Sequence, residues 1–381
     1  YIKNPMVKNK IYRYFSIEIL KSFITILFAF SIVAWTVRSV NFLDLIVDSG
    51  HSLRSYFLFS ILNISGIITK FIPLSFLLAL VVSIYKFNNK NELMIVWTTG
   101  LSKLRLANLF LFLSFVITLI HLLFSSVITP YTLNKSRSTL TNDELGNFSI
   151  NMRENTFTDT FAGITFFVEK KINDRFYNIF ISDEENKFQN VISTKENNNN
   201  LIILAKEGFI SQKKLVLFNG RIQSISSDNE LDEIVFKKTE LVLSNFDSRT
   251  TKVPKVQEIS TNYLMRCNNG ENVVLIKDNY HCPENNLRKE TVARRLGLPL
   301  YIPLVSIICS FLLRSRGKNS DSFFKRYFIF FISFITLLSA ELLLRFAGFS
   351  ELNTLLYFLI PIIGLPLSYY ILKINLEKQE S

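Results

Sequence analysis

The stretch "LANLFLFLSFVITLIHLLFSSVITPYTLN", from Leu106 to Asn134, contains no Lys, Arg, Asp or Glu. A helix needs about 20 consecutive apolar residues to cross the hydrocarbon core of a bilayer, and this stretch is long enough to do so. The composition of the whole chain agrees, because 49% of its 381 residues are hydrophobic and 36 are Phe. We therefore expect an integral membrane protein rather than two or three soluble domains.

Five further stretches have the length and composition of membrane spans. Together with Leu106–Asn134 they make three spans before a long polar segment and three after it. The five are Ser22–Val37, Ser55–Tyr85, Leu296–Leu313, Tyr327–Leu344 and Leu352–Leu372.

The distribution of Lys and Arg predicts the orientation, because cytoplasmic loops carry an excess of them. The N-terminal segment, the loops after spans two and four, and the C-terminal segment contain 16 of these residues, and the opposite flanks contain six. Both termini are therefore expected in the cytoplasm and the middle segment outside. Topology explains most of the formal net charge of +12. An anionic ligand of the outward-facing residues is a second explanation.

The middle segment reads as β structure, because short alternating runs rich in β-branched and aromatic residues replace the helical pattern. Turn signals separate the runs, including Asn219-Gly220, which favours a type I′ hairpin, and the tract Asn197–Asn200. Such a pattern indicates a sandwich or jelly roll, serving either as a spacer or as a groove for an apolar ligand. The runs are Gly163–Val168, Phe176–Ile181, Leu201–Leu204, Leu215–Phe218, Ile234–Phe236 and Leu241–Leu243.

The expected fold class is an α-helical membrane protein with six transmembrane helices, three on each side of an inserted all-β, jelly-roll-like domain. Residues 1–134 would form the first helical half, 135–290 the inserted domain and 291–381 the second helical half. Cys267 and Cys282 fall in the outer segment, where a disulfide is possible. Two free thiols are the alternative, and a metal site with His281 and Glu284 is less favoured.

Motifs of known catalytic chemistry are absent from the sequence. It has no nucleophile–His pair, no G-x-x-x-x-G-K-[ST] phosphate loop, no H-E-x-x-H and no G-x-S-x-G. We expect a non-catalytic chain that itself binds no ATP, metal or nucleic acid.

Ionisable residues within spans are costly and are candidates for function. Lys70 lies in span two, and Glu341 lies in span five, four residues before Arg345, a spacing that favours an intrahelical ion pair. Arg38 marks the outer end of span one. The simpler explanation of Arg38 and Lys70 is that they are interfacial or snorkelling side chains.

The loop between spans two and three contains a short apolar segment with helix-capping residues. Asn89 or Asn91 can cap a helix over about residues 90–100, with Glu92 in the first turn, where the helix dipole favours an acid. Gly100 suits the end of that helix. A turn lying on the lipid surface is the plain explanation.

Four motifs resemble the LptF/LptG permease family of the lipopolysaccharide exporter, in the same order along the chain. "VNFLDLIVDSG" (Val40–Gly50) is more similar to LptF than to LptG. One departure is Thr291, which stands where the family has an acid, with Glu290 one place earlier. The four motifs are "RYFSIEILKS" (Arg13–Ser22), "KFIPLSFLLAL" (Lys70–Leu80), "NELMIVWTTGLSK" (Asn91–Lys103) and "RRLGLPL" (Arg294–Leu300).

This resemblance implies a permease subunit that extracts lipopolysaccharide from the inner membrane of a Gram-negative bacterium. The implied partners are an LptG-type permease, an LptB-type ATPase dimer that holds ATP and Mg²⁺, an LptC-type jelly roll and an LptA-type periplasmic bridge. The resemblance assigns ATPase coupling to Glu92, Leu93, Val96, Trp97 and Gly100. The basic residues that we expect at the lipid phosphates are Arg38 above all, then Lys70, Arg54 and Arg345.

Two alternatives stay open. One is a permease for another envelope lipid or for lipoproteins. The other is a membrane receptor with a periplasmic sensing domain, which would need a cytoplasmic output domain. A membrane enzyme would need a nucleophile, a base or a metal cluster.

Overall fold

The protein is described by a computed structural model in which two compact units are distinguished. The helical unit consists of Tyr1–Val37, Asn63–Asn134 and Lys255–Ser381, and the sheet unit consists of Arg38–Leu62 and Lys135–Pro254. The described residues are 5–43, 53–146, 154–161, 163–172, 175–183, 199–211, 214–225, 231–242, 254–267, 282–314 and 320–380.

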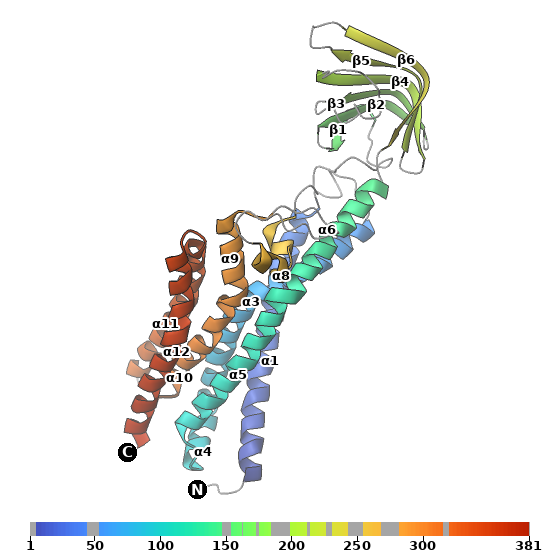
Figure 1. Cartoon of the computed structure of the whole chain (residues 1–381). Helices are drawn as coiled ribbons and strands as arrows, with labels where there is room; N and C mark the ends of the chain where they lie inside the picture. The colour runs from blue at the N-terminus through green and yellow to red at the C-terminus, as the bar shows by residue number, and fades with distance from the viewer. Residues whose placement is uncertain are drawn as a thin grey trace. The chain divides into compact units, whose positions relative to one another are not determined.

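Six helical spans in the described part of the chain are long and apolar enough to cross a membrane (Figure 1). Three precede the strands and three follow them, so the predicted fold class is confirmed. The third span runs through a π-helical segment, η1, and the fourth through a short 3₁₀ segment, Leu298–Leu300. The bounds are α1 Pro5–Asn41, α3 Leu53–Asn89, α5 Lys103–Leu123, η1 Phe124–Ile128, α6 Thr129–Gly146, α9 Asn285–Leu296, α10 Tyr301–Ser310, α11 Ser320–Ala347 and α12 Glu351–Glu380.

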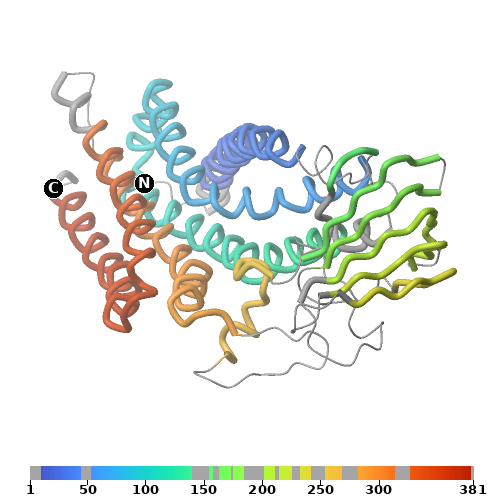
Figure 2. The backbone as a smooth tube through the Cα atoms, turned by 90° about the horizontal axis from the view of Figure 1, so that it is seen from above, coloured from blue at the N-terminus to red at the C-terminus, as the bar shows by residue number. Residues whose placement is uncertain are grey.

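The spans differ in how much of their surface this chain covers. In the fourth span 78% of the apolar window is buried, whereas in the first, fifth and sixth spans only 17% is buried. The fourth span therefore lies inside the helical unit, and α11 and α12 lie side by side at its margin (Figure 2). Much of the apolar surface of α1, α11 and α12 is left for lipid or for another protein.

Small polar residues join α3 to the end of the third span. The hydroxyl oxygens of Thr69 and Thr129 lie 2.8 Å apart, and those of Ser65 and Thr132 are also hydrogen-bonded. Such short side chains allow close approach of helices inside a membrane, where hydroxyl hydrogen bonds supply part of the attraction.

The strands form one antiparallel sheet in which every neighbour in space is the neighbour in sequence, in the order β1-β2-β3-β4-β5-β6. The described strands are therefore an up-and-down meander without a crossover. Figure 1 shows the sheet as curved, and one of its faces buries an apolar core. The bounds are β1 Thr156–Phe161, β2 Ile164–Ile172, β3 Arg175–Asp183, β4 Asn199–Ser211, β5 Lys214–Ile225 and β6 Leu231–Val242.

The predicted hairpin at Asn219-Gly220 is wrong, because both residues lie inside β5. Asn219 has a left-handed φ of 50°, which asparagine tolerates better than most residues. Here that conformation shifts the alternation of side chains, so that Leu217 and Ile222 are both buried. Asn178 has the same conformation in β3, with φ 51°. The local signal was real, but it marks a bend within the strands rather than a turn between them.

The boundary of the inserted domain also differs from the prediction. The sheet unit ends at Pro254, and residues from Lys255 onward belong to the helical unit rather than to a domain extending to 290. The short segments η3, Val256–Glu258, and α8, Thr261–Arg266, pack with Val292 of α9 in a small apolar cluster. The sheet unit also includes Arg38–Leu62, which the prediction placed in the first helical half.

Candidate functional site

The short helix predicted between spans two and three is α4, Glu92–Thr98. Asn91 occupies its N-cap with φ 58° but makes no side-chain capping bond. Gly100, with φ 82°, ends it, and the amides of Gly100 and Leu101 donate to the carbonyls of Trp97 and Val96 at 3.1 and 3.4 Å. These two bonds form a Schellman motif, in which a left-handed glycine closes the helix.

The burial pattern of α4 separates a face that holds it from a face that is open. Leu93 and Val96 are buried in the core of the helical unit, and Trp97 packs partly against that core. Met94 and Ile95 are 63% and 61% exposed. Of the residues that the resemblance assigns to ATPase coupling, Leu93 and Val96 therefore offer a partner little surface. Met94 and Ile95 offer more, and no local signal in the sequence distinguishes them from their buried neighbours.

Glu92, at the start of α4, receives a hydrogen bond from the first span. The hydroxyl of Tyr14 on α1 donates to its carboxylate, at 3.2 Å from Oε2 and 3.3 Å from Oε1. One turn further along α1, Glu18 forms an ion pair with Lys86 in the last turn of α3. Tyr14 and Glu18 both lie in the family-like motif Arg13–Ser22. Their contacts could not be predicted from it, because the partners are distant in sequence.

The rings beside these polar contacts fix α1 against α3. Phe15 and Phe87 pack edge to face with centroids 4.5 Å apart, and Phe23 and Phe76 do so at 6.1 Å. Edge-to-face pairs add to the gain from burial alone. These ring contacts lie on one side of α1, and Glu18 lies on the same side.

The four basic residues proposed for lipid phosphates are not gathered in one unit. Arg38 and Arg54 belong to the sheet unit, and Lys70 and Arg345 belong to the helical unit. Arg38 is half-buried at the end of α1, and the other three are exposed.

Glu341 of span five forms its ion pair with a different helix, not within its own helix as expected. Glu341 accepts from Arg294 Nη1 of α9 at 2.6 Å, and Arg294 Nη2 also donates to Glu290 at 3.2 Å. The predicted pair of Glu341 with Arg345 is therefore replaced by a contact between helices. Glu290, the acid displaced by one place from the family pattern, is part of this arrangement.

Arg295 anchors the segment that returns from the sheet unit. It is buried, and its guanidinium donates to Thr261 Oγ1 at 2.7 Å and to the carbonyl of Gln257 at 3.0 Å. Thr261 in turn donates to the carbonyl of Ser126 at 2.6 Å. A disulfide joins Cys267, just after α8, to Cys282, just before α9. No cluster of metal-ligating side chains occurs among the residues that the structure describes, and His281 lies outside them.

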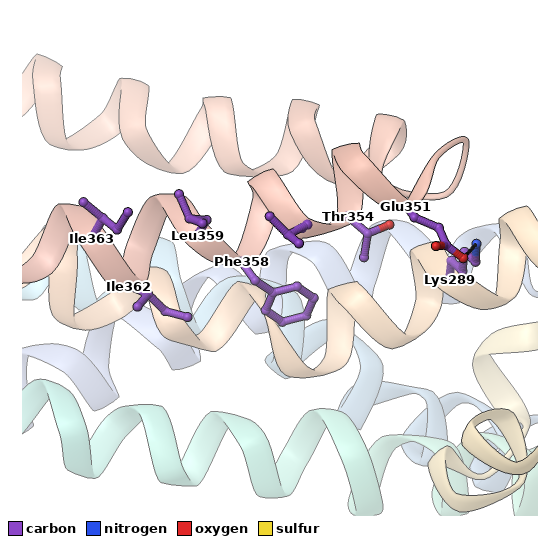
Figure 3. A pocket seen from close by; sticks show the side chains of 8 residues that line it. Lys289, Glu351, Thr354, Phe358, Leu359, Ile362 and Ile363 are labelled. Atoms are coloured by element: carbon purple, nitrogen blue, oxygen red, sulfur yellow. Dashed lines mark hydrogen bonds and ion pairs between the residues drawn. The ribbon is translucent and has the colours of Figure 1, made fainter.

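An apolar groove of about 570 Å³ runs along α12 beside α9. Figure 3 shows Leu359, Ile362 and Ile363 along it and Lys289 at one end, where Nζ lies 3.4 Å from Glu351 Oε1. None of the four predicted phosphate ligands lines this groove. The lining residues are Lys289, Glu351, Thr354, Leu355, Phe358, Leu359, Ile362 and Ile363.

Comparison with known proteins identifies a family and a relative. Residues 13–373 match the family model described as lipopolysaccharide export system permease LptF/LptG. A protein of Rickettsia prowazekii described only as uncharacterized is 24% identical over 248 residues, which is 63% of this chain. The chain spans about 65% of the length of that relative.

Proposed function

The chain belongs to the LptF/LptG family of lipopolysaccharide export permeases, and from this premise we propose that it is a membrane subunit of an ATP-driven exporter. It extracts lipopolysaccharide from the inner membrane and passes it to a periplasmic bridge. The observation that carries the ATP-driven part is α4, a short helix held by Leu93 and Val96 that leaves Met94 and Ile95 open.

A lipid with several acyl chains needs a power source to leave a bilayer. Each buried methylene contributes about 0.8 kcal/mol to membrane retention. The described chain has no recognisable nucleotide-binding motif, so the energy would come from a separate ATPase, of the LptB type, bound at α4. Met94 and Ile95 would enter an apolar groove of that ATPase. The Glu92 carboxylate has acceptor positions beyond those used by Tyr14, which suit a basic residue of the ATPase.

The open faces of α1 and α11 would meet a second, LptG-type permease and the lipid itself. Both spans are only 17% buried in this chain, and their exposed side chains are large and apolar. Between two such subunits, Phe-rich walls would receive acyl chains. The exposed apolar residues are Ile24, Phe28, Ile32, Val33 and Val37 on α1, and Phe328, Phe331, Ile335, Leu338, Leu342 and Phe346 on α11.

The excess of Lys and Arg near α4 and both termini supports a cytoplasmic position for that end of the helices. The sheet unit would then lie in the periplasm, where it would pass lipid through LptC-type and LptA-type jelly rolls. Arg38, followed by Lys70, Arg54 and Arg345, would pair with the lipid phosphates through charge-assisted hydrogen bonds.

Copurification with a matched pair of variants tests this function. We expect the wild-type chain to copurify with an ATPase dimer and a second six-span permease. Met94→Asp should lose the ATPase and keep the permease, because it places a charge in the apolar contact. The control is Met265→Asp on α8, since Met265 is 57% exposed against 63% for Met94. Retention of the ATPase by Met94→Asp, or copurification of a kinase instead, would contradict the proposal.

A further inference from the structure

The first span braces the joint between α3 and α4. α3 ends at Asn89 and α4 begins at Glu92, and between them Asn91 adopts a left-handed conformation with φ 58°. We propose that Tyr14 is a positioning residue that carries movement of α4 into α1, through its hydrogen bond to Glu92. This inference rests on the proposed function of α4 as the helix that meets the ATPase.

The geometry of the hydroxyl supports a directed contact. The Tyr14 oxygen lies nearly equidistant from both carboxylate oxygens of Glu92, at 3.2 and 3.3 Å. The ring of Tyr14 is held by Phe15 and Phe87, with centroids 5.7 and 6.4 Å away. Two rings thus orient the hydroxyl toward the Glu92 carboxylate.

A second contact lies on the other side of the joint. Glu18, four residues after Tyr14 on the same face of α1, pairs with Lys86 of α3. Ser83 of α3 donates to Ser22 of α1 at 3.3 Å. α1 is therefore attached to α3 before the joint and to α4 after it. Rotation of α4 about the joint alone would break the bond between Tyr14 and Glu92, so while this bond holds, α1 must follow α4.

α1 is well placed to carry such a movement. It is one continuous helix from Pro5 to Asn41, and a helix transmits displacement along its axis because its backbone bonds are internal. Only 17% of its apolar window is buried by this chain, and its polar contacts with α3 named above lie close to Tyr14. Movement entering at Tyr14 would reach the apolar face of α1 that we propose meets the lipid.

Reconstitution of the variant Tyr14→Phe tests this inference. The chain is assembled with its copurified permease and ATPase in vesicles containing lipopolysaccharide, and both the lipid extracted and the ATP hydrolysed are measured. We expect assembly and continuing ATP hydrolysis, with lipid extracted per ATP lowered about fivefold, the scale for losing one ordinary, solvent-exposed hydrogen bond. The control Tyr85→Phe, in which a 55% exposed tyrosine of α3 loses its hydroxyl, should keep the wild-type ratio.

A double variant shows whether the hydroxyl acts through Glu92. If it does, Tyr14→Phe combined with Glu92→Ala should extract no less lipid per ATP than Glu92→Ala alone, because coupled residues are not additive. Additive losses, or a wild-type ratio in Tyr14→Phe, would overturn the inference. If Met94→Asp still loses the ATPase in that case, the proposed function stands and only the role of Tyr14 fails. If Met94→Asp keeps the ATPase, both fail.

Discussion

At the scale of single residues, two adjacent arginines have different tasks. Arg294 lies between two acids, Glu290 and Glu341, and remains partly exposed. Arg295 is buried, and its hydrogen-bond acceptors are neutral oxygens of Thr261, Val256 and Gln257. Removing Arg295 leaves the buried hydroxyl oxygen of Thr261 and two part-buried carbonyl groups without their donor, which costs more than losing a partly exposed ion pair.

We therefore predict that Arg295→Met destabilises the helical unit more than Arg294→Met does. The expected loss is about 1–3 kcal/mol at Arg295 and at most about 1 kcal/mol at Arg294. Thermal unfolding of the detergent-solubilised chain compares the two variants, and limited proteolysis reports whether the segment around α8 is released. An equal or larger loss at Arg294 would contradict this account of the anchor.

The residues of α4 show which part of a site a sequence predicts. Glu92 at the start and Gly100 at the end are local signals, because helix caps depend on neighbouring residues only, and the helix was placed correctly. Which face is open depends on the helices packed against it. Leu93 and Met94 are both apolar neighbours, and only the fold decides that Leu93 is buried and Met94 exposed.

At the scale of elements, glycines in the sheet mark where strands bend. A Cβ added at Gly220 would collide with the carbonyl oxygen of Leu204 and the ring of Phe236. A Cβ at Gly208 would approach the side-chain ends of Ile179 and Leu217 at 2.6 and 2.9 Å and the carbonyl oxygen of Val216 at 3.0 Å, against 2.3 Å from the Leu204 carbonyl oxygen at Gly220. Side-chain ends can move aside, whereas a backbone carbonyl in the sheet cannot.

Gly220→Ala should therefore destabilise the sheet more than Gly208→Ala. Overpacking of this kind costs about 1–3 kcal/mol, and we expect the value for Gly220 at the upper end. Hydrogen exchange of the β4 and β5 amides in the full chain measures the difference, since the loss appears as faster exchange. Slower amide exchange in Gly220→Ala than in Gly208→Ala would contradict this prediction, because it would show that the backbone of β5 can move to accommodate the added Cβ.

At the scale of the whole molecule, the proposed orientation places α4 and the sheet unit on opposite sides of the membrane. Two single substitutions test it, Met94→Cys on α4 and Val235→Cys on β6, both at exposed positions. The native cysteines interfere little, because Cys267 and Cys282 are bonded and Cys309 is buried.

A membrane-impermeant maleimide added to spheroplasts should label Val235→Cys at once and Met94→Cys only after lysis. We expect this result because the excess of Lys and Arg near α4 retains that end of the helices in the cytoplasm. Labelling of Met94→Cys in intact spheroplasts would reverse the orientation and remove α4 from contact with a cytoplasmic ATPase.

The sequence by itself determined the six spans, the inserted β segment and the place of α4. These follow from local quantities, namely length of apolar runs, alternation, and caps. The tertiary structure decided the rest: the partner of Glu341, the anchor at Arg295, the bend at Asn219 and the link from Tyr14 to Glu92. Each joins residues distant in the chain, or depends on what packs around a residue. Periodicity cannot specify such contacts, because it describes one element and not the neighbour against which that element packs.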